Sequence, residues 1–538
     1  MIKGKGKSVF SSIAIGKIFV FEKADLSYSL EGECSENELE KLNAAIDKAR
    51  ADLSALYEKT LKELGQEQAD IIDVQSMFLE DPDFTEGIEA EINSGLSAPA
   101  AVKKVGDEMA ESFASLDDDY MKARALDVRD ISDRLVRTLL GADKGNQIEE
   151  PSILVSDDLT PSETISLDKS KILAIVIKNG SSNSHTAILA RAMGIPALVQ
   201  ADIDITCTLS GKMMIVDGFD STYVIDPDES EIKKAEKKKE DEERNKRELE
   251  QYRGKSAVTK SGKKIRVFAN IGSSDDALLA VKNDADGVGL MRSEFLYLGR
   301  DSFPTEDELF EQYRKAVEAL EGRLCVIRTL DIGADKKVDY FNLEEEENPA
   351  LGYRGIRICI RQKDIFRTQL RAIYRASAYG KVAIMFPMII SKEEVLEIKD
   401  FLTVVEKELE DDGIAFDKNI EKGIMIETPA AAVIADELAP LVDFFSVGTN
   451  DLSQYTLAID RQNEKLDYFF NAHHEAILRL MENVAREAVK NNIWAGICGE
   501  LGSDLTLTDR FIKMGYTELS VSPAKVLSVK KNVINSEV

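Results

Sequence analysis

The second half of the chain repeats one pattern, a short and nearly continuous apolar run followed by a longer stretch with helical spacing of apolar residues. Strands buried on both faces of a parallel sheet read as such runs, and helices cover them. Eight runs follow Gly254, namely "IRVFANI" (265–271), "GVGLM" (287–291), "CVIRTLD" (325–331), "VAIMFPM" (382–388), "GIMIET" (423–428), "FFSVG" (444–448), "WAGIC" (494–498) and "ELSVS" (518–522). Eight strands that alternate with helices predict a (β/α)8 barrel.

The first half of the chain changes its pattern twice. Residues 1 to about 28 carry two β-like runs, of which "SIAIGKIFVF" is the clearer, and residues 35 to 140 are poor in glycine, with apolar residues at three- and four-residue spacing. Strand-like runs then return as "SILVS", "KILAIVI", "PALVQ" and "KMMIVDG". The order predicts an α/β domain with a helical subdomain inserted after its first strands.

A highly charged stretch separates the two halves. Fourteen of the seventeen residues from Glu231 to Arg247 are charged, and the two signs alternate. This pattern is typical of a solvated helix that connects domains, and a binding face is the alternative.

Composition and charge narrow the classes of function. A formal net charge of −29 argues against nucleic-acid binding, which needs a basic footprint, and against docking on anionic membranes, but it allows a basic protein partner to be steered in. No apolar run reaches the roughly 18 residues of a membrane span, and no cleavage site follows the basic start. The five cysteines are widely spaced and odd in number, so they indicate neither a disulfide framework nor a zinc site. We therefore expect a cytoplasmic protein.

Polar residues lie at the ends of many of the predicted barrel strands. Glu427 and Asp451 would bring two carboxylates to adjacent strand ends, enough to hold Mg²⁺. Arg292 and Arg328 suit recognition of phosphate or carboxylate, and Arg461 lies ten residues after Asp451. Each residue alone also has a structural explanation, such as a rim pair between arginine and glutamate. As a set they indicate a Mg²⁺-dependent site for a small phosphorylated acid.

His185 is one of only three histidines, and it stands where a run of small polar residues meets the helix-forming segment "TAILARAM". A histidine at the start of a helix lies among unpaired N–H groups and the positive end of the helix dipole. That environment disfavours the imidazolium and leaves a nitrogen lone pair free for nucleophilic attack. An ordinary capping histidine is the alternative.

These motifs together resemble Enzyme I of the bacterial sugar phosphotransferase system, the phosphoenolpyruvate–protein phosphotransferase family. "SNSHTAILAR" resembles the phosphohistidine motif of the family. The barrel motifs follow in their usual order, "GVGLMRSEFLYLGRDSFPTEDE", "IRTLDIGADK", "NPALGYRGIRI", "IMFPMI", "GIMIETPAA", "FFSVGTNDLSQYTLAIDR" and "GICGELG". The resemblance extends over essentially the whole chain.

The resemblance implies a multidomain α/β protein. A swivelling phosphohistidine α/β domain would comprise residues 1–30 and 145–228, with a helical phosphocarrier-binding subdomain at 31–144. A charged helical linker or hinge would span 229–256. A phosphoenolpyruvate-binding TIM barrel would span 257–538.

The resemblance also assigns a role to individual residues. It implies that Mg²⁺ lies on Glu427 and Asp451, and that His185 attacks phosphorus while Cys498 protonates the enolate carbon to give pyruvate. It implies that the remaining polar residues bind the substrate, Arg292, Arg328, Lys336 and Asn450 at the phosphoryl group and Arg461 at the carboxylate. His185 would then pass the phosphoryl group to a histidine of the small phosphocarrier protein, which would dock on the helical subdomain near "EQADIIDVQSMFLEDPDF". A homodimer through the barrel is also implied.

Two other interpretations remain open. A dikinase- or synthase-type enzyme shares the phosphohistidine domain and barrel, but it adds an ATP-binding domain for which this chain has no residues. A non-catalytic regulatory scaffold derived from the family would be favoured by the loss of His185, Glu427, Asp451 or Cys498, and all four are present.

The chain departs from the family pattern in four places, one of which, the opening "SVFSSIAIG", should matter little. In the other three, the paired glycine before the histidine is Gly180-Ser181, the usual His-Pro pair is His474-Glu475, and the chain ends at Val538, soon after the eighth strand. A positive φ at Ser181 would be strained. We expect His473 and His474 to be surface or helix-start residues, and the short C-terminal end to affect only the packing of the barrel bottom.

Overall fold

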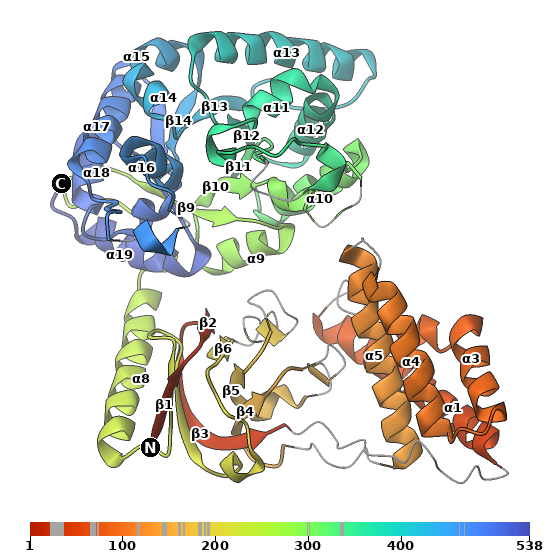
Figure 1. Ribbon diagram of the computed structural model, residues 1–538. Helices are drawn as coiled ribbons and strands as arrows, with labels where there is room; N and C mark the ends of the chain where they lie inside the picture. The colour runs from red at the N-terminus through yellow and green to blue at the C-terminus, as the bar shows by residue number, and fades with distance from the viewer. Residues whose placement is uncertain are drawn as a thin grey trace. The chain divides into compact units, whose positions relative to one another are not determined.

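Eight parallel strands in the C-terminal half close into a barrel (Figure 1). The structure is a computed structural model, and it describes residues 1–538 except for 22–36, 65–71, 73–74, 116–118, 142–147, 160–162, 165–166, 181–185, 188–189, 191–193, 299, 301, 334–337, 462 and 467. The barrel strands are β9 (Arg266–Ile271), β10 (Gly287–Arg292), β11 (Leu324–Arg328), β12 (Val382–Phe386), β13 (Glu421–Ile426), β14 (Phe444–Val447), β15 (Trp494–Ile497) and β16 (Glu518–Val521). All eight predicted runs are therefore strands, and the predicted barrel is confirmed.

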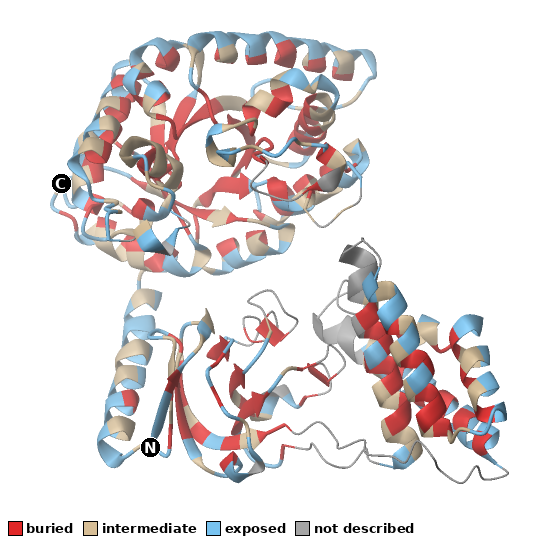
Figure 2. Cartoon of the chain, viewed as in Figure 1, coloured by how far each residue is buried: buried red, intermediate tan, exposed pale blue. Residues whose placement is uncertain are grey.

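Helices surround the barrel. They are α9 (Ser274–Lys282), α10 (Glu306–Ala319), α11 (Ile356–Arg361), α12 (Lys363–Ala376), α13 (Lys392–Asp411), α14 (Pro429–Val433), α15 (Ala435–Leu438), α16 (Thr449–Leu457), α17 (Glu475–Lys490), α18 (Thr508–Met514) and α19 (Val526–Asn535). Figure 2 shows the strands buried and the outer faces of these helices exposed. The chain thus still supplies a helix, α19, after its eighth strand, and buried Lys530 ties that helix to Asp284 (2.9 Å) and Asp286 (3.0 Å).

Side chains of the barrel strands alternate between two cores. One core lies between the strands and the surrounding helices and contains, for example, Phe445, Val447 and Ile497. The other fills the inside of the barrel and consists of Leu290, Val326, Ala383, Met385, Met425, Phe444 and Cys498. Successive residues of a strand point to opposite faces, so Ser446, Gly496 and Glu518 share the inner face with Phe444 and Cys498.

The N-terminal half forms a separate compact unit, Met1–Asn245, while the barrel belongs to Lys246–Val538. Its eight-stranded sheet has the order β1-β8-β7-β3-β4-β5-β6-β2. The strands are β1 (Ile2–Lys5), β2 (Lys7–Phe10), β3 (Ile13–Val20), β4 (Ser152–Ser156), β5 (Ile172–Ile177), β6 (Ala197–Val199), β7 (Met213–Asp217) and β8 (Thr222–Ile225). The helices α1 (Glu38–Leu64), α3 (Pro82–Asn93), α4 (Ala98–Ser115) and α5 (Asp119–Leu140) follow β3 and precede β4, which confirms the predicted insertion.

The sequence pattern predicted two strands in residues 1 to about 28, where the structure has three, and it missed β8. One edge pairs β1 with β8 and β8 with β7, all antiparallel. Both β1 and β8 have only four residues, too few to establish an alternating pattern.

The charged stretch forms α8 (Glu229–Glu250), as predicted. It is not solvated all round, because Ile232 and Ala235, one turn apart, pack against Ile13 and Ile215 of the sheet. None of the described helices is both long and apolar enough to cross a membrane.

Candidate active site

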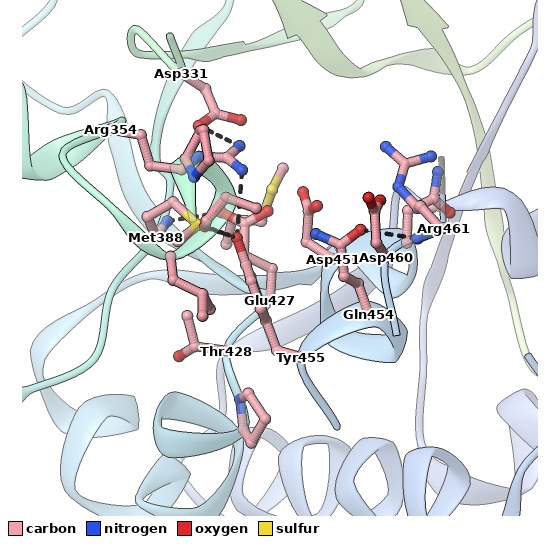
Figure 3. A pocket seen from close by; sticks show the side chains of 18 of the residues that line it. Asp331, Arg354, Met388, Glu427, Thr428, Asp451, Gln454, Tyr455, Asp460 and Arg461 are labelled. Carbon is pink, nitrogen blue, oxygen red and sulfur yellow. Dashed lines mark hydrogen bonds and ion pairs between the residues drawn. The ribbon is translucent and has the colours of Figure 1, made fainter. Parts of the chain in front are cut away.

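A cavity of about 1300 Å³ opens at the carboxyl ends of the barrel strands. Seven of the residues that the sequence indicates for the site line it, namely Arg292, Arg328, Glu427, Asn450, Asp451, Arg461 and Cys498. Figure 3 shows part of this lining, with Glu427, Asp451 and Arg461 among the labelled side chains. The two remaining residues, His185 and Lys336, lie outside the described residues.

A chain of buried ion pairs forms one wall of the cavity. The Arg328 guanidinium lies 2.7 Å from Glu294 Oε1 and 2.9 Å from Asp331 Oδ2. The other Asp331 oxygen lies 2.9 Å from Arg354 Nη2, and Figure 3 shows Arg354 and Asp331 joined by that contact. Burial alone would lower the pKa of Arg328, but Glu294, Asp331 and Glu427 outweigh it and raise the pKa above its usual value. The guanidinium is therefore charged and held in one orientation.

Glu427 follows β13 and is almost completely buried. Its Oε1 accepts the Met388 backbone N–H at 2.6 Å, while its Oε2 has no hydrogen-bond partner among the described residues. Burial raises the pKa of Glu427 well above its ordinary value, and Asp331 and Asp451 raise it further, against Arg328 and Arg354. An unpartnered buried carboxylate oxygen beside a second carboxylate is a position that a cation would stabilise.

The loop after β14 brings Asp451 to the same cavity. The helix α16 begins at Thr449, directly after the strand, and Asp451 lies in its first turn. Gly448 makes room for Glu427, because a Cβ built there would lie 3.0 Å from Glu427 Oε2. Asn450 links this helix to the loop after β15, since its side chain accepts from Glu500 N (3.0 Å) and donates to Glu500 Oε1 (3.2 Å).

Cys498 directly follows β15 inside the mouth and is 3 % exposed. Its thiol donates to the Val447 carbonyl at 3.6 Å. Burial, opposed by the Ser446 hydroxyl, raises the pKa of Cys498 to about 12. The side chain is therefore a protonated thiol at neutral pH and can give up a proton, but it is not a ready nucleophile.

Two arginines lie at the rim of the cavity and are exposed. Arg292 ends β10, and among the residues that the structure describes it makes no ion pair. Arg461 follows α16, and its backbone N–H donates to Gln454 Oε1 at 3.2 Å. Together with Arg328 these guanidiniums can bind an anion with several oxygens from more than one side.

The structure adds Arg354 to the residues that the sequence indicates. It lies in the quoted motif "NPALGYRGIRI" but does not follow a strand, so placement at strand ends did not find it. Arg354 is 6 % exposed, and besides Asp331 it donates to the Tyr455 hydroxyl at 3.3 Å. The only signal in the sequence was its place in that motif, directly before Gly355.

The phosphohistidine motif is described only at its edges. Gly180 has φ +87°, so the positive φ of this turn falls on the glycine that the chain retains, while Ser181 lies outside the described residues. Thr186 is buried, and its hydroxyl lies 3.3 Å from that of Thr164.

The other two histidines have the expected structural roles. His474 caps α17 by accepting the Ala476 N–H at 3.1 Å. His473 Nε2 lies 2.6 Å from Asp504 Oδ2, and both histidines are exposed.

Within the described ranges, no group of three or more His, Cys, Asp or Glu side chains is arranged to hold a metal ion. Mg²⁺ does not require such a group, because it binds through one or two carboxylates and completes its shell with water and substrate phosphate. The free Glu427 Oε2 and nearby Asp451 fit that pattern.

The chain matches known proteins along nearly its whole length. Residues 246–538 match the PEP-utilising enzyme, PEP-binding domain, residues 148–220 the mobile domain of PEP-utilising enzymes, and residues 5–124 their N-terminal domain. A phosphoenolpyruvate-protein phosphotransferase of Staphylococcus aureus strain MSSA476 is 39% identical over 534 residues, which covers 98% of this chain and 93% of the relative. This chain belongs to the phosphoenolpyruvate-protein phosphotransferase family.

A second member of the family gives the same result. The phosphoenolpyruvate-protein phosphotransferase of Listeria monocytogenes serovar 1/2a is 40% identical over 527 residues, which covers 97% of this chain and 92% of the relative. A solved structure of Enzyme I, determined by NMR in solution, is 35% identical and covers 45% of this chain and 99% of its own, with a TM-score of 0.39.

Proposed function

We propose that this chain transfers the phosphoryl group of phosphoenolpyruvate to its own His185 and then to a histidine of a small phosphocarrier protein, with release of pyruvate. One observation carries the proposal: residues from five separate strand ends and loops, chosen on sequence alone, line a single cavity at the carboxyl end of the barrel. The relatives named above are phosphotransferases that use phosphoenolpyruvate. This would be the first step of phosphoenolpyruvate-dependent sugar uptake.

The buried arginine is the main contribution of the barrel to phosphoryl transfer. Transfer passes through a loose transition state with charge on the peripheral oxygens, so fixed positive charge stabilises it. Arg328 is fixed by Glu294 and Asp331 before any ligand binds. We assign Arg328, Arg292, Asn450 and Lys336 to the phosphoryl group, and the rim residue Arg461 to the substrate carboxylate.

Glu427 and Asp451 are the residues that would hold Mg²⁺. When bound, the ion would neutralise charge on the substrate oxygens. The carboxylate oxygen of Glu427 that lacks a partner supports this assignment.

Cys498 would act as the general acid. Its high pKa keeps the proton on sulfur until the enolate forms, and a position at the end of β15 places it in the cavity rather than behind it. The S–H bond breaks as the C–H bond of the pyruvate methyl group forms.

The N-terminal half would carry His185 and receive the phosphocarrier. We propose the domain boundaries given by the resemblance, 1–30 with 145–228, 31–144, 229–256 and 257–538. The division between the two compact units, at Asn245 and Lys246, falls inside the proposed linker. Met77 supports carrier docking on the helical subdomain, because it is 65 % exposed within an acidic stretch.

We further propose a cytoplasmic homodimer that associates through the barrel. The barrel unit exposes large apolar side chains, including Tyr468 at 92 % and Phe469 at 65 %. Exposed aromatic residues of this kind are enriched at protein interfaces. Sedimentation of the full chain against concentration checks this part.

The test of the proposed function uses phosphoenolpyruvate labelled in its phosphoryl group, with Mg²⁺. We expect the full chain to acquire a label that is stable in base and lost in acid, as for phosphohistidine, and the His185→Ala variant to acquire none. An unlabelled wild-type chain, or a labelled variant, would refute the proposal.

A further inference from the structure

A second buried carboxyl group, Glu518, lies inside the barrel beneath the mouth. It is 1 % exposed and begins β16. The strand register pairs Ser446 with Gly496 and Gly496 with Glu518, so these three residues form one row across three neighbouring strands. All three point inward, and Cys498 is the next inward position above Gly496, about 7 Å further along the strand.

Two glycines create the space that this side chain occupies. A Cβ built on Gly496 would lie 1.8 Å from Glu518 Oε2, so the carboxyl extends over Gly496 toward Ser446. A Cβ built on Gly289 would lie 1.8 Å from Ser520 Oγ and 2.9 Å from Glu518 Oε1. The Ser520 hydroxyl donates to that Oε1. Any larger residue at either position would displace the pair.

Three buried polar atoms on the inner face of the barrel lack a hydrogen-bond partner. Glu518 Oε2, Ser446 Oγ and Asn270 Oδ1 are buried and have no hydrogen-bond partner among the described residues. The amide nitrogen of Asn270 already donates to the carbonyls of Cys498 (3.0 Å) and Ser520 (3.3 Å). Buried polar atoms left unpaired in this way are commonly joined by an internal water molecule.

The surroundings of Glu518 keep its proton in place. Burial raises the pKa of Glu518 to about 8, although the Ser520 hydroxyl, the Arg266 guanidinium and the Ile497 backbone N–H oppose the rise. In the described part of the chain, the charged or titratable side chains that act on Glu518 are Arg266 from β9 and Cys498 from β15. Glu421 begins β13, so like Glu518 it lies at the amino-terminal end of the barrel, which we call the floor. Its side chain accepts from Trp494 Nε1 at 3.0 Å. Glu518 is therefore mainly a neutral acid at pH 7.

We propose that Glu518 returns a proton to Cys498 through a water molecule held between Glu518 and Ser446. The proposal rests on the proposed function, in which Cys498 loses its proton to the enolate once in each turnover. While pyruvate still covers the mouth, solvent reaches the thiolate poorly, and Glu518 is an acid one row below Cys498 on the inner face of the barrel. Glu518 does not touch the substrate, so it is a positioning residue that acts through Cys498.

The proton balance closes over one turnover. The Cys498 S–H bond breaks as the pyruvate C–H bond forms, which leaves a thiolate. The Glu518 O–H proton passes to the water, and a proton of that water passes to sulfur. The Glu518 carboxylate then takes a proton from solvent, and this is the proton that the conversion of phosphoenolpyruvate to pyruvate consumes.

The test compares two exchange rates in the full chain, in D₂O with Mg²⁺, phosphoenolpyruvate and carbon-labelled pyruvate. Labelled carbon passes from pyruvate to phosphoenolpyruvate whenever the reaction reverses. This exchange does not require Glu518, because the same proton moves between the Cys498 sulfur and the pyruvate methyl carbon. Deuterium enters pyruvate only when Cys498 exchanges its proton with solvent. We expect Glu518→Gln to retain the carbon exchange and to lower the ratio of deuterium entry to carbon exchange by about 10-fold, less than the loss of a direct general acid.

Three comparisons make the result decisive. Glu421→Gln, a matched change at the floor that keeps an acceptor for Trp494, should leave the ratio unchanged. Ser446→Ala, which removes only the bridging hydroxyl, should lower it in the same direction, and it decides the question if Glu518→Gln does not fold. The wild-type ratio should fall as the pH rises through about 8, since Glu518 then loses its proton, and Glu518→Gln should lack that dependence.

An unchanged ratio in both Glu518→Gln and Ser446→Ala would overturn the role of Glu518. So would an equal fall of both exchange rates in Glu518→Gln, which is the result of a purely structural role. A wild-type chain without any carbon exchange would instead refute the proposed function.

Discussion

Glu427 at the mouth of the barrel and Glu518 at its floor are both buried carboxyl groups with one unpartnered oxygen. Their surroundings differ in charge. Glu427 lies among Asp331, Asp451, Arg328 and Arg354, whereas a hydroxyl group and Arg266 are the main partners of Glu518. The pKa of each carboxyl is raised chiefly by burial, but only the mouth adds further carboxylates that a cation could bind.

The difference shows how one barrel interior can support two kinds of chemistry. At the mouth, arginines and acids alternate, so a bound cation and an anionic substrate would complete the charge balance. At the floor, none of the described carboxylates acts on the pKa of Glu518, and the carboxyl stays neutral by keeping its proton. Substitutions at the two ends should therefore have different consequences.

The largest effect should come from removing the charge at the mouth. Glu427→Gln keeps an acceptor for the Met388 N–H but loses the negative charge that would bind the ion. We expect kcat/KM for phosphoenolpyruvate to fall by about 10³-fold, equal to about 4 kcal/mol of transition-state stabilisation. Steady-state pyruvate release measures this, and a loss of less than tenfold would remove Glu427 from the metal site.

Cys498 lies between the two ends, and its replacement should have the next largest effect. Cys498→Ala should slow pyruvate formation by about 10²-fold, the scale of general acid catalysis. Binding of phosphoenolpyruvate should survive, because the arginines are untouched, and a binding titration of the same variant is the control. Turnover close to that of the wild type would leave Cys498 with only a packing role.

The protonation of Glu518 at the floor should make the free energy of unfolding depend on pH. Folded Glu518 binds a proton between its ordinary pKa of 4.5 and its raised pKa of about 8, and the unfolded chain does not. The free energy of unfolding of the wild type should therefore fall as the pH rises through that window.

Glu518→Gln removes this contribution. Relative to the wild type, the variant should gain about 3.5 kcal/mol of stability between pH 5 and pH 8. Denaturant unfolding of both proteins at the two pH values measures the difference. A difference independent of pH would mean that Glu518 is ionised in the folded barrel.

The smallest effect should come from a change at the floor that preserves charge. Arg266 lies with its guanidinium 4.4 Å from the centre of the Trp494 ring. Arg266→Lys keeps the positive charge far from the mouth, so phosphoenolpyruvate turnover at pH 7 should change less than about twofold. A large loss would show that the two ends of the barrel are not independent.

The sequence was sufficient for the barrel and for much of its mouth, because both depend on local patterns. Each buried strand is an apolar run, and a polar residue directly after it must lie at the carboxyl end of the barrel. That argument found Glu427 and Cys498. Arg354 was not found by it, because that residue reaches the mouth from a loop and is fixed by its contacts with Asp331 and Tyr455.

Glu518 could not have been found in this way. It begins its strand instead of ending it, and its surroundings depend on Gly496 and Gly289 in two other strands. Only the register of the closed barrel brings these three positions together. Likewise, the contact of Ile232 and Ala235 with the N-terminal sheet is hidden in a sequence dominated by charge.

The central claim is that the barrel mouth binds phosphoenolpyruvate while His185, on the other compact unit, only accepts the phosphoryl group. Calorimetric titration of full-length variants with phosphoenolpyruvate and Mg²⁺ tests it most directly. The account predicts that His185→Ala binds with the affinity of the wild type, and that Arg328→Lys, which loses the two-pronged guanidinium, binds at least about tenfold more weakly. Loss of binding in His185→Ala with full binding in Arg328→Lys would contradict it.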